Sequence, residues 1–175
     1  LENLSHWTEA ATRNSEYSAR LVASVDDEIV AANTEFGFNL LAELVGQDKD
    51  QNVFISPFSI STALAMTYNG AAGKTAAAMA AALRYDGMSL DEVNEASYAL
   101  LRDLDAMNLE VEIAITNSIW ARQGLPVRPN FLDRNRRYFD TEVATLDFND
   151  PEAVVVINQW VKANTKEKID SIIDK

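Results

Sequence analysis

Few residues in this sequence could carry catalytic chemistry. There is no cysteine, and His6 is the single histidine. Thiolate chemistry, a histidine-dependent triad and a two-histidine metal site are therefore all excluded for this chain alone. Gly73-Lys74-Thr75 matches the end of a phosphate-binding loop, but Tyr68 stands where that motif requires its first glycine. We therefore expect a protein that is not an enzyme, with no catalytic residue, no metal and no cofactor.

Hydroxyl side chains concentrate instead in one uncharged segment, residues 56–68. Ser56 can accept hydrogen bonds from the free N–H groups of a first helical turn. Proline has no N–H, but the N–H at position 57 would have no partner in that turn, so Pro57 costs nothing there. The helix that follows is apolar or small, but it also carries Ser59, Ser61, Thr62 and Thr67. A helix without charge over more than three turns is expected to be buried on nearly every face.

Composition limits the partners of the chain. Its 175 residues are 47% apolar, which is enough for one domain with a core. The 27 acidic residues outnumber the 15 basic ones and give a net charge of −12. Binding to nucleic acid or to an anionic membrane surface needs a basic face, so neither is expected. No stretch is long and apolar enough to span a bilayer.

The hydrophobic periodicity predicts the elements that position these residues. Helices are expected near residues 27–46, 57–68, 74–83, 90–107, 129–140 and 150–164, and strands near 52–55, 109–120 and 142–148. Ser89 and Glu92 form a capping box. Thr75, and Asn149 or Asp150, are further candidate caps. Asn117 falls on the apolar face of its strand and needs a buried partner.

The strands lie far apart in the sequence. The long strand near 109–120 has no hairpin partner next to it, and a lone strand is not stable. We therefore expect residues 29–175 to be the N-terminal part of a larger α+β domain whose remainder lies beyond Lys175. Residues 1–28 are mixed and polar and are expected to be an N-terminal extension.

A series of short motifs resembles the serpin family. The sequence NVFISPFSISTALAM at 52–66, followed by NGAAGKT at 69–75, is similar to the family's strand-and-helix signature. The likeness continues through NTEFGF at 33–38, TNSIW at 116–120, FLD at 131–133, VATLDF at 143–148, INQWV at 157–161 and TKEKI at 165–169. The motifs keep the family order and spacing from about residue 30 to 175. One departure is Glu167, where the family commonly has glycine.

The resemblance implies a serpin-like α+β fold, with helices packed on a large mixed central sheet that is incomplete in this chain. It also implies an inhibitor of serine endopeptidases. In serpins, a protease cleaves an exposed reactive loop, the loop inserts into the central sheet, and the protease is trapped as an acyl-enzyme. The reactive bond is not in this chain. The native fold would be metastable, and strand insertion would release the stored strain.

The resemblance also suggests two groups of site residues. In the first, the central helix lies beneath the sheet-opening region, called the shutter, and includes Ser56, Pro57, Ser59, Asn69 and Gly70. The two serines would bond to groups on later strands that this chain lacks, although Ser56 also serves as an N-cap. In the second, the helix that lies across the sheet and must move is anchored by Asn158, Trp160, Thr165 and Lys168.

The function therefore has two candidate forms. The first is a suicide-substrate inhibitor whose partners are a target serine protease, or a cysteine protease, and the C-terminal remainder of the same serpin. The second is a non-inhibitory serpin acting as a carrier, storage protein or chaperone. Heparin is not expected as a partner, because residues 90–107 carry one arginine and five acidic residues. An extracellular, secreted protein is favoured over a cytoplasmic one.

Overall fold

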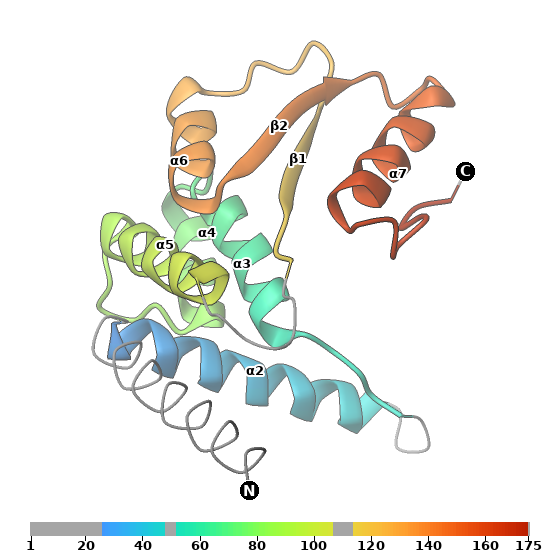
Figure 1. The fold of residues 1–175 in the computed structure, drawn as a ribbon. Coiled ribbons are helices and arrows are strands. Elements are labelled where there is room, and N and C mark those ends of the chain that lie inside the picture. Colours follow the sequence, from blue (N-terminus) through green and yellow to red (C-terminus); the bar gives the residue numbers. More distant parts are fainter. Residues whose placement is uncertain (1–25, 48–51, 107–113, 175) are drawn as a thin grey trace, which may run out of the picture.

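The computed structural model describes residues 26–47, 52–106 and 114–174 (Figure 1). The elements in chain order are α2 (Asp27–Gln47), α3 (Pro57–Tyr68), α4 (Gly73–Leu83), α5 (Leu90–Ala106), β1 (Asn117–Arg122), α6 (Pro129–Phe139), β2 (Thr141–Leu146) and α7 (Glu152–Asn164). The predictions for residues 1–25 and for the start of the strand at 109–113 lie outside the described residues. Asp27 and Glu28, which we assigned to the extension, form the first turn of α2.

The main core lies between helices α2, α3, α4, α5 and α6. Its buried members are Ile29, Ala32, Ala65, Met66, Leu83, Tyr85, Val93, Ala96 and Phe139. Helix α2 crosses the start of α3 at Gly37, where an added Cβ would lie 3.0 Å from Cβ of Pro57. That close approach requires glycine, and it fixes the position of α3 on α2.

Helix α3 is less enclosed than its composition predicts. Its buried face consists of Ser61, Thr62, Ala65 and Met66. Ile60 and Leu64 keep 36% and 37% of their surface exposed. The prediction of burial on nearly every face is therefore wrong for this chain, since the described elements cover one side of α3 and leave the other open.

The segment before α3 is extended but does not form a strand. Residues 52–56 pair with no other strand in the described part of the chain. Phe54 is 99% exposed although it is large and apolar. The apolar run correctly indicated an extended backbone, but the expected strand is absent because a strand needs a hydrogen-bonded neighbour.

The sheet of the described residues has two parallel strands. Each residue of β1 pairs with the residue 24 positions later in β2, from Asn117 opposite Thr141 to Arg122 opposite Leu146. Helix α6 makes the connection between them (Figure 1). Asn117 has the buried partner that its position requires, because its Nδ2 donates to the carbonyl of Phe139 over 3.1 Å. The large mixed sheet that we expected is thus represented here by two strands.

Helix caps were predicted with mixed success. The capping box is confirmed: the Ser89 N–H donates to Glu92 Oε2 over 2.7 Å, and the Glu92 N–H donates to Ser89 Oγ over 3.3 Å. Thr75 does not cap α4, whose N-cap is Ala72 without a side-chain bond. Helix α7 begins one residue later than expected, with Pro151 at the N-cap, although Asp150 Oδ1 still accepts from the Glu152 N–H over 3.0 Å.

The capping box predicts a pH-dependent contribution to stability. The hydrogen bonds from Ser89, first from its N–H and then from its hydroxyl, hold the pKa of Glu92 below its ordinary value. A carboxyl group with a lowered folded-state pKa stabilises above its unfolded pKa, and this contribution is lost as the pH falls through the folded pKa. Glu92→Gln should therefore destabilise the protein at neutral pH, and the deficit should shrink toward acid. Urea titrations from about pH 7 to about pH 3 would measure it. A deficit that stays constant, or that equals the deficit of Glu43→Gln on the exposed face of α2, would contradict this account.

Candidate functional site

The two serines predicted for the shutter lie together at the start of α3. Ser56 is the N-cap, and its Oγ accepts from the Ser59 N–H over 3.4 Å. The two hydroxyl oxygens are 2.9 Å apart, so one hydroxyl donates to the other. Both residues are exposed. The pair therefore has remaining hydrogen-bonding capacity, which a group on another strand could use.

Asn69 and Gly70 lie at the opposite end of α3, where a buried amide pair joins α3 to α5. Asn69 Nδ2 donates to Asn94 Oδ1 over 2.9 Å, and Asn94 Nδ2 donates back to Asn69 Oδ1 over 2.9 Å. Asn69 Nδ2 also donates to the Ala65 carbonyl over 3.3 Å. The exposed fractions are 6% for Asn69 and 0% for Asn94. The sequence analysis did not select Asn94. Its position next to Val93, on the apolar side of α5, was the feature that indicated a buried amide.

Gly70 lies close against helix α6. A Cβ at this position would lie 3.1 Å and 3.2 Å from two ring carbons of Phe131. These distances are tighter than a Cβ normally makes, so a side chain at position 70 would push α6 away from the end of α3. The glycine thus positions α6, and through it the β1–β2 connection.

Trp160 attaches α7 to the sheet. Its ring meets Trp120 of β1 edge to face, with ring centroids 5.9 Å apart, an arrangement that stabilises aromatic pairs. Its indole N–H donates to Glu142 of β2. Helix α7 otherwise makes less contact with the other described elements than any other helix does. Helix α7 also has a buried apolar face, formed by Ala153, Ile157 and Val161, so Trp160 is a specific anchor beside this apolar packing.

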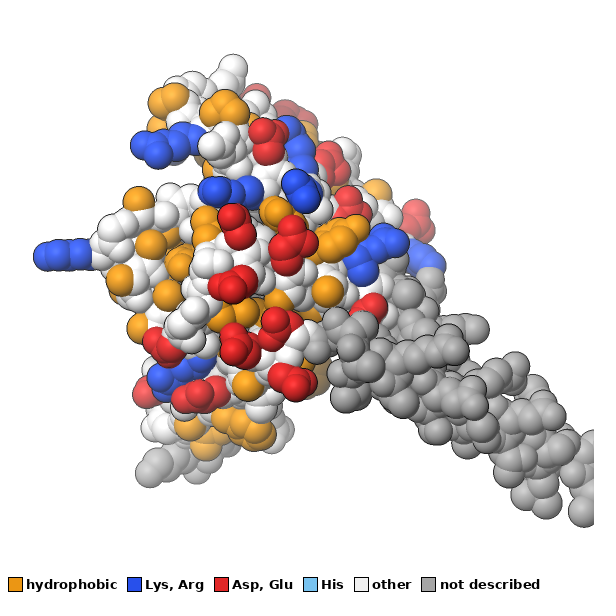
Figure 2. All heavy atoms as spheres, turned by 90° about the vertical axis from the view of Figure 1, so that its left-hand side faces the viewer, with side chains coloured by type: hydrophobic (Ala, Val, Ile, Leu, Met, Phe, Trp, Pro, Cys, Tyr) orange, Lys and Arg blue, Asp and Glu red, His pale blue; other side chains and the backbone are white. Residues whose placement is uncertain are grey.

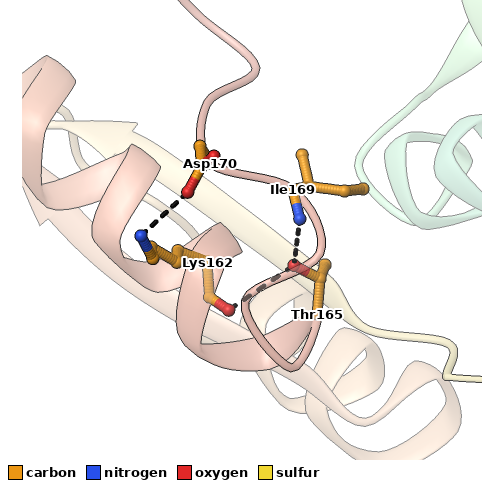
Figure 3. A network of polar contacts seen from close by, with 4 residues as sticks. All are labelled: Lys162, Thr165, Ile169 and Asp170. Carbon is orange, nitrogen blue, oxygen red and sulfur yellow. Dashed lines mark hydrogen bonds and ion pairs between the residues drawn. The ribbon is translucent and has the colours of Figure 1, made fainter.

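The other residues predicted on α7 hold the segment that follows it (Figure 3). Thr165 Oγ1 accepts from the Ile169 N–H over 3.2 Å, and Lys162 Nζ lies 2.8 Å from Asp170 Oδ1. Asn158 Oδ1 accepts from the N–H groups of Ile172 and Ile173, and its Nδ2 donates to the Ile173 carbonyl over 2.9 Å. The exposed Lys168 contributes its backbone N–H, which donates to Thr165 O over 3.0 Å. We call residues 165–174, held in this way, the folded-back tail.

The turn that begins the folded-back tail contains two residues in the left-handed region. Lys166 has φ 50° and Glu167 has φ 59°. Side chains are strained there, and glycine is not. The departure from the family pattern at Glu167 therefore leaves the turn geometry intact, and the glutamate is accommodated at the expense of local strain.

Glu167→Gly is expected to stabilise the protein by about 0.5–1 kcal/mol, because relief of left-handed strain exceeds the extra entropy of glycine in the unfolded chain. Urea titration of both proteins measures this difference. Lys168→Gly is the matched control, since Lys168 is not among the residues with positive φ, and it should destabilise instead. If both variants lost stability alike, the strain at Glu167 would be disproved.

The two predicted groups do not form one site. Among the described residues, no hydrogen bond or ion pair joins the α3 set to the α7 set. The α3 set is itself divided between the two ends of a helix of 12 residues, a length of about 18 Å. The structure therefore shows a serine pair, a buried amide junction and a helix held by its tail and by Trp160.

An apolar groove runs beside the start of α3. It has a volume of about 600 Å³, and its lining includes Val30, Phe38, Leu41, Val53, Phe54 and Phe58. Phe38 at 69% and Phe54 at 99% are exposed far beyond what is usual for phenylalanine. Exposed apolar surface of this kind indicates a docking surface.

The described residues provide neither a metal site nor a membrane span. No group of three or more His, Asp or Glu side chains among them could hold a metal ion. None of the helices in the described part of the chain is long and apolar enough to cross a bilayer.

Comparison with solved structures identifies the fold. The structure of reactive-loop-cleaved human thyroxine binding globulin superposes with a TM-score of 0.75 at 28% identity, covering 85% of this chain and 44% of that one. Cleaved kallistatin in complex with heparin gives a TM-score of 0.72 at 25% identity, covering 79% of this chain and 41% of that one. Both neighbours superpose on most of this chain, so the predicted class of fold is confirmed.

Sequence comparison then identifies the family. The model for the serpin (serine protease inhibitor) family matches residues 31–175. Bovine (Bos taurus) leukocyte elastase inhibitor is 35% identical over 149 residues, covering 84% of this chain and 39% of that protein. The chain belongs to the serpin family, and it spans about two fifths of the length of the curated relatives it matches.

Proposed function

We propose that this chain is the N-terminal part of a serpin that inhibits a serine-type endopeptidase by reactive-loop insertion. The observation that carries the proposal is the attachment of α7. A helix that must leave the face of a sheet should have few contacts with it. Helix α7 has few close backbone contacts with the other described elements, and Trp160 supplies its aromatic and hydrogen-bond contacts with β1 and β2. The sheet below it has two strands in the described part of the chain and so has edges to which further strands can be added.

The apolar groove supports the proposal that the rest of the serpin packs against this chain. Its lining residues come from α2, α3, α5 and the extended segment before α3. A further strand pairing with residues 52–55 would satisfy the free backbone groups of that segment and cover Phe54. The same packing would bury the exposed side of α3, which carries Ile60 and Leu64. The partner that this proposal names is the C-terminal remainder of the same protein.

The proposal is tested by incubating the whole protein with elastase-like, chymotrypsin-like and trypsin-like serine proteases. An inhibitor forms a covalent complex that survives SDS, and the residual protein cleaved in the loop melts at a higher temperature than the native protein. A protease whose active-site serine is blocked should give no complex. Cleavage by every protease without complex formation, and without a rise in melting temperature, would contradict inhibition.

A non-inhibitory role is the second candidate, because one solved neighbour is a thyroxine binding globulin. Such a serpin would act as a carrier, storage protein or chaperone. The incubation described above separates the two candidates, since a carrier would be cleaved as an ordinary substrate or would resist the proteases.

Surface charge supports a partner other than heparin, although the kallistatin neighbour was solved with it. Acidic side chains gather over the middle of the face shown in Figure 2, where α5 exposes Asp91, Glu92 and Glu95. Arg137 of the neighbouring α6 lies 3.8 Å from Glu95, so part of the positive charge of α6 is compensated by α5.

An extracellular location also belongs to this proposal, and detection of the protein in culture medium would test it.

A further inference from the structure

Asn69 and Gly70 form an asparagine–glycine sequence, which is the dipeptide most prone to deamidation. In this reaction the backbone nitrogen of the following residue attacks the asparagine carboxamide. Glycine favours the attack because it has no side chain to block it and because its backbone is free to rotate.

Packing favours both residues of this dipeptide. A side chain at position 70 would displace the ring of Phe131, which lies 3.1 Å from where its Cβ would be. Asn69 supplies one donor and one acceptor to the reciprocal pair of bonds with Asn94 in a buried junction. The reactive dipeptide therefore follows from the contacts among α3, α5 and α6.

The closed structure opposes the reaction in two ways. The Asn69 carboxamide is fixed by bonds to Asn94 and by its bond to the Ala65 carbonyl. The attacking group is also engaged, because the Gly70 N–H donates to Thr67 O over 2.9 Å. Asn69 itself has helical dihedral angles, φ −57° and ψ −21°. The reaction requires both partners to leave these positions, so the end of α3 must first separate from α5.

We propose that Asn69 is a deamidation site whose reaction is controlled by local opening of the α3–α5 junction, with Asn94 as the residue that keeps it closed. The Gly70 nitrogen loses its proton and attacks Cγ of Asn69, forming a five-membered imide. The Nδ2 group takes up a proton and leaves as ammonia. Water then adds to one imide carbonyl and breaks one of the two C–N bonds, which leaves aspartate or isoaspartate at position 69.

The product cannot restore the junction. A carboxylate at position 69 has no donor for Asn94 Oδ1 or for the Ala65 carbonyl, and it places a charge where the native residue is 6% exposed. An uncompensated buried charge is strongly unfavourable. Deamidation would thus make later openings of the junction more frequent. The fraction of molecules deamidated at position 69 would increase with the frequency at which α3 and α5 separate.

The test measures deamidation at Asn69 by peptide mass spectrometry during incubation of the whole protein at 37 °C. Three samples are compared, the folded wild type, the wild type unfolded in urea, and Asn94→Ala. Val161→Ala, on the buried face of α7, is the matched control that weakens packing away from the junction. Folded wild type should react about 100-fold or more slowly than the unfolded chain. Asn94→Ala should react about 30-fold or more faster than folded wild type, because it leaves a buried amide unpaired and so favours the open junction.

The control should react at about the wild-type rate. Equal rates in folded and unfolded wild type would overturn the proposal, since the junction would then give no protection. Equal acceleration in Asn94→Ala and Val161→Ala would also overturn it, because global unfolding rather than the junction would then control the reaction. The comparison of folded with unfolded wild type stands even where Asn94→Ala fails to fold.

Discussion

Replacing Asn94 with alanine is expected to lower the free energy of unfolding by about 2–3 kcal/mol, because a buried amide loses its partner and a small cavity is left. Both amides of the pair are almost fully buried, and each donates to the other over 2.9 Å. Without Asn94, the Oδ1 atom of Asn69 has no donor, and its Nδ2 keeps only the longer bond to Ala65. Urea titration of the whole protein, followed by circular dichroism, measures the loss.

The double variant Asn69→Ala/Asn94→Ala separates the amide pair from ordinary packing. Once one asparagine is gone, removing the other leaves no further amide unpaired. The double variant should therefore lose about 1–2 kcal/mol less free energy of unfolding than the sum of the two single variants. Asn164→Ala is the matched control, because its amide is exposed and bonds only within α7; it should change stability by less than about 0.5 kcal/mol. Strict additivity of the two core variants would show that the pair is not coupled.

Replacing Ser59 with phenylalanine is expected to convert the whole protein into polymers, or into a latent form, at temperatures where the wild type stays monomeric. The two hydroxyl oxygens of Ser56 and Ser59 are 2.9 Å apart at the start of α3. A phenyl ring there removes the bond and occupies the space in which we propose that a strand of the remainder packs. Such a ring would favour opening of the sheet. Native gels after graded heating measure the loss of monomer.

Two further variants test this interpretation. Ser59→Ala removes the hydroxyl without adding bulk and should cause a smaller shift in the same direction. Thr75→Phe places the same ring at an exposed position on α4 and should leave the protein monomeric. If Ser59→Phe showed unchanged heat stability and no polymer, Ser59 would have no shutter role and would serve only the first turn of α3.

Local sequence signals predicted the helices well. Ser89 and Glu92 have the spacing at which each side chain reaches the other's backbone N–H, so the start of α5 could be read from two residues. Ser56 and Pro57 marked the start of α3 in the same way. The polar Asn117 in an apolar strand correctly required a buried partner, but that partner, the carbonyl of Phe139, lies 22 residues away and could not be named.

Features that depend on distant residues were not predictable from local pattern. Asn69 and Asn94 are 25 residues apart, and each alone resembles an ordinary polar residue at the edge of an apolar stripe. The strand expected at 52–55 failed because pairing is a property of two segments, and the described residues supply one. The φ of Glu167 depends on how the folded-back tail bonds to α7, so the local sequence did not predict it. The only indication of a left-handed turn was the glycine that the family commonly has at this position.

The parallel pairing of β1 and β2 has a consequence for the order of folding. The two strands and α6 form one continuous stretch, Asn117 to Leu146, in which every strand contact spans 24 residues. Closing a loop of this size costs little chain entropy compared with pairing to a strand from a distant half of the protein. The pairing of β1 with β2 therefore needs no strand that is synthesised later. We expect strands synthesised later to be added to the edges of this parallel pair. Until they are added, these edges are exposed and are the first part of the nascent chain that could aggregate.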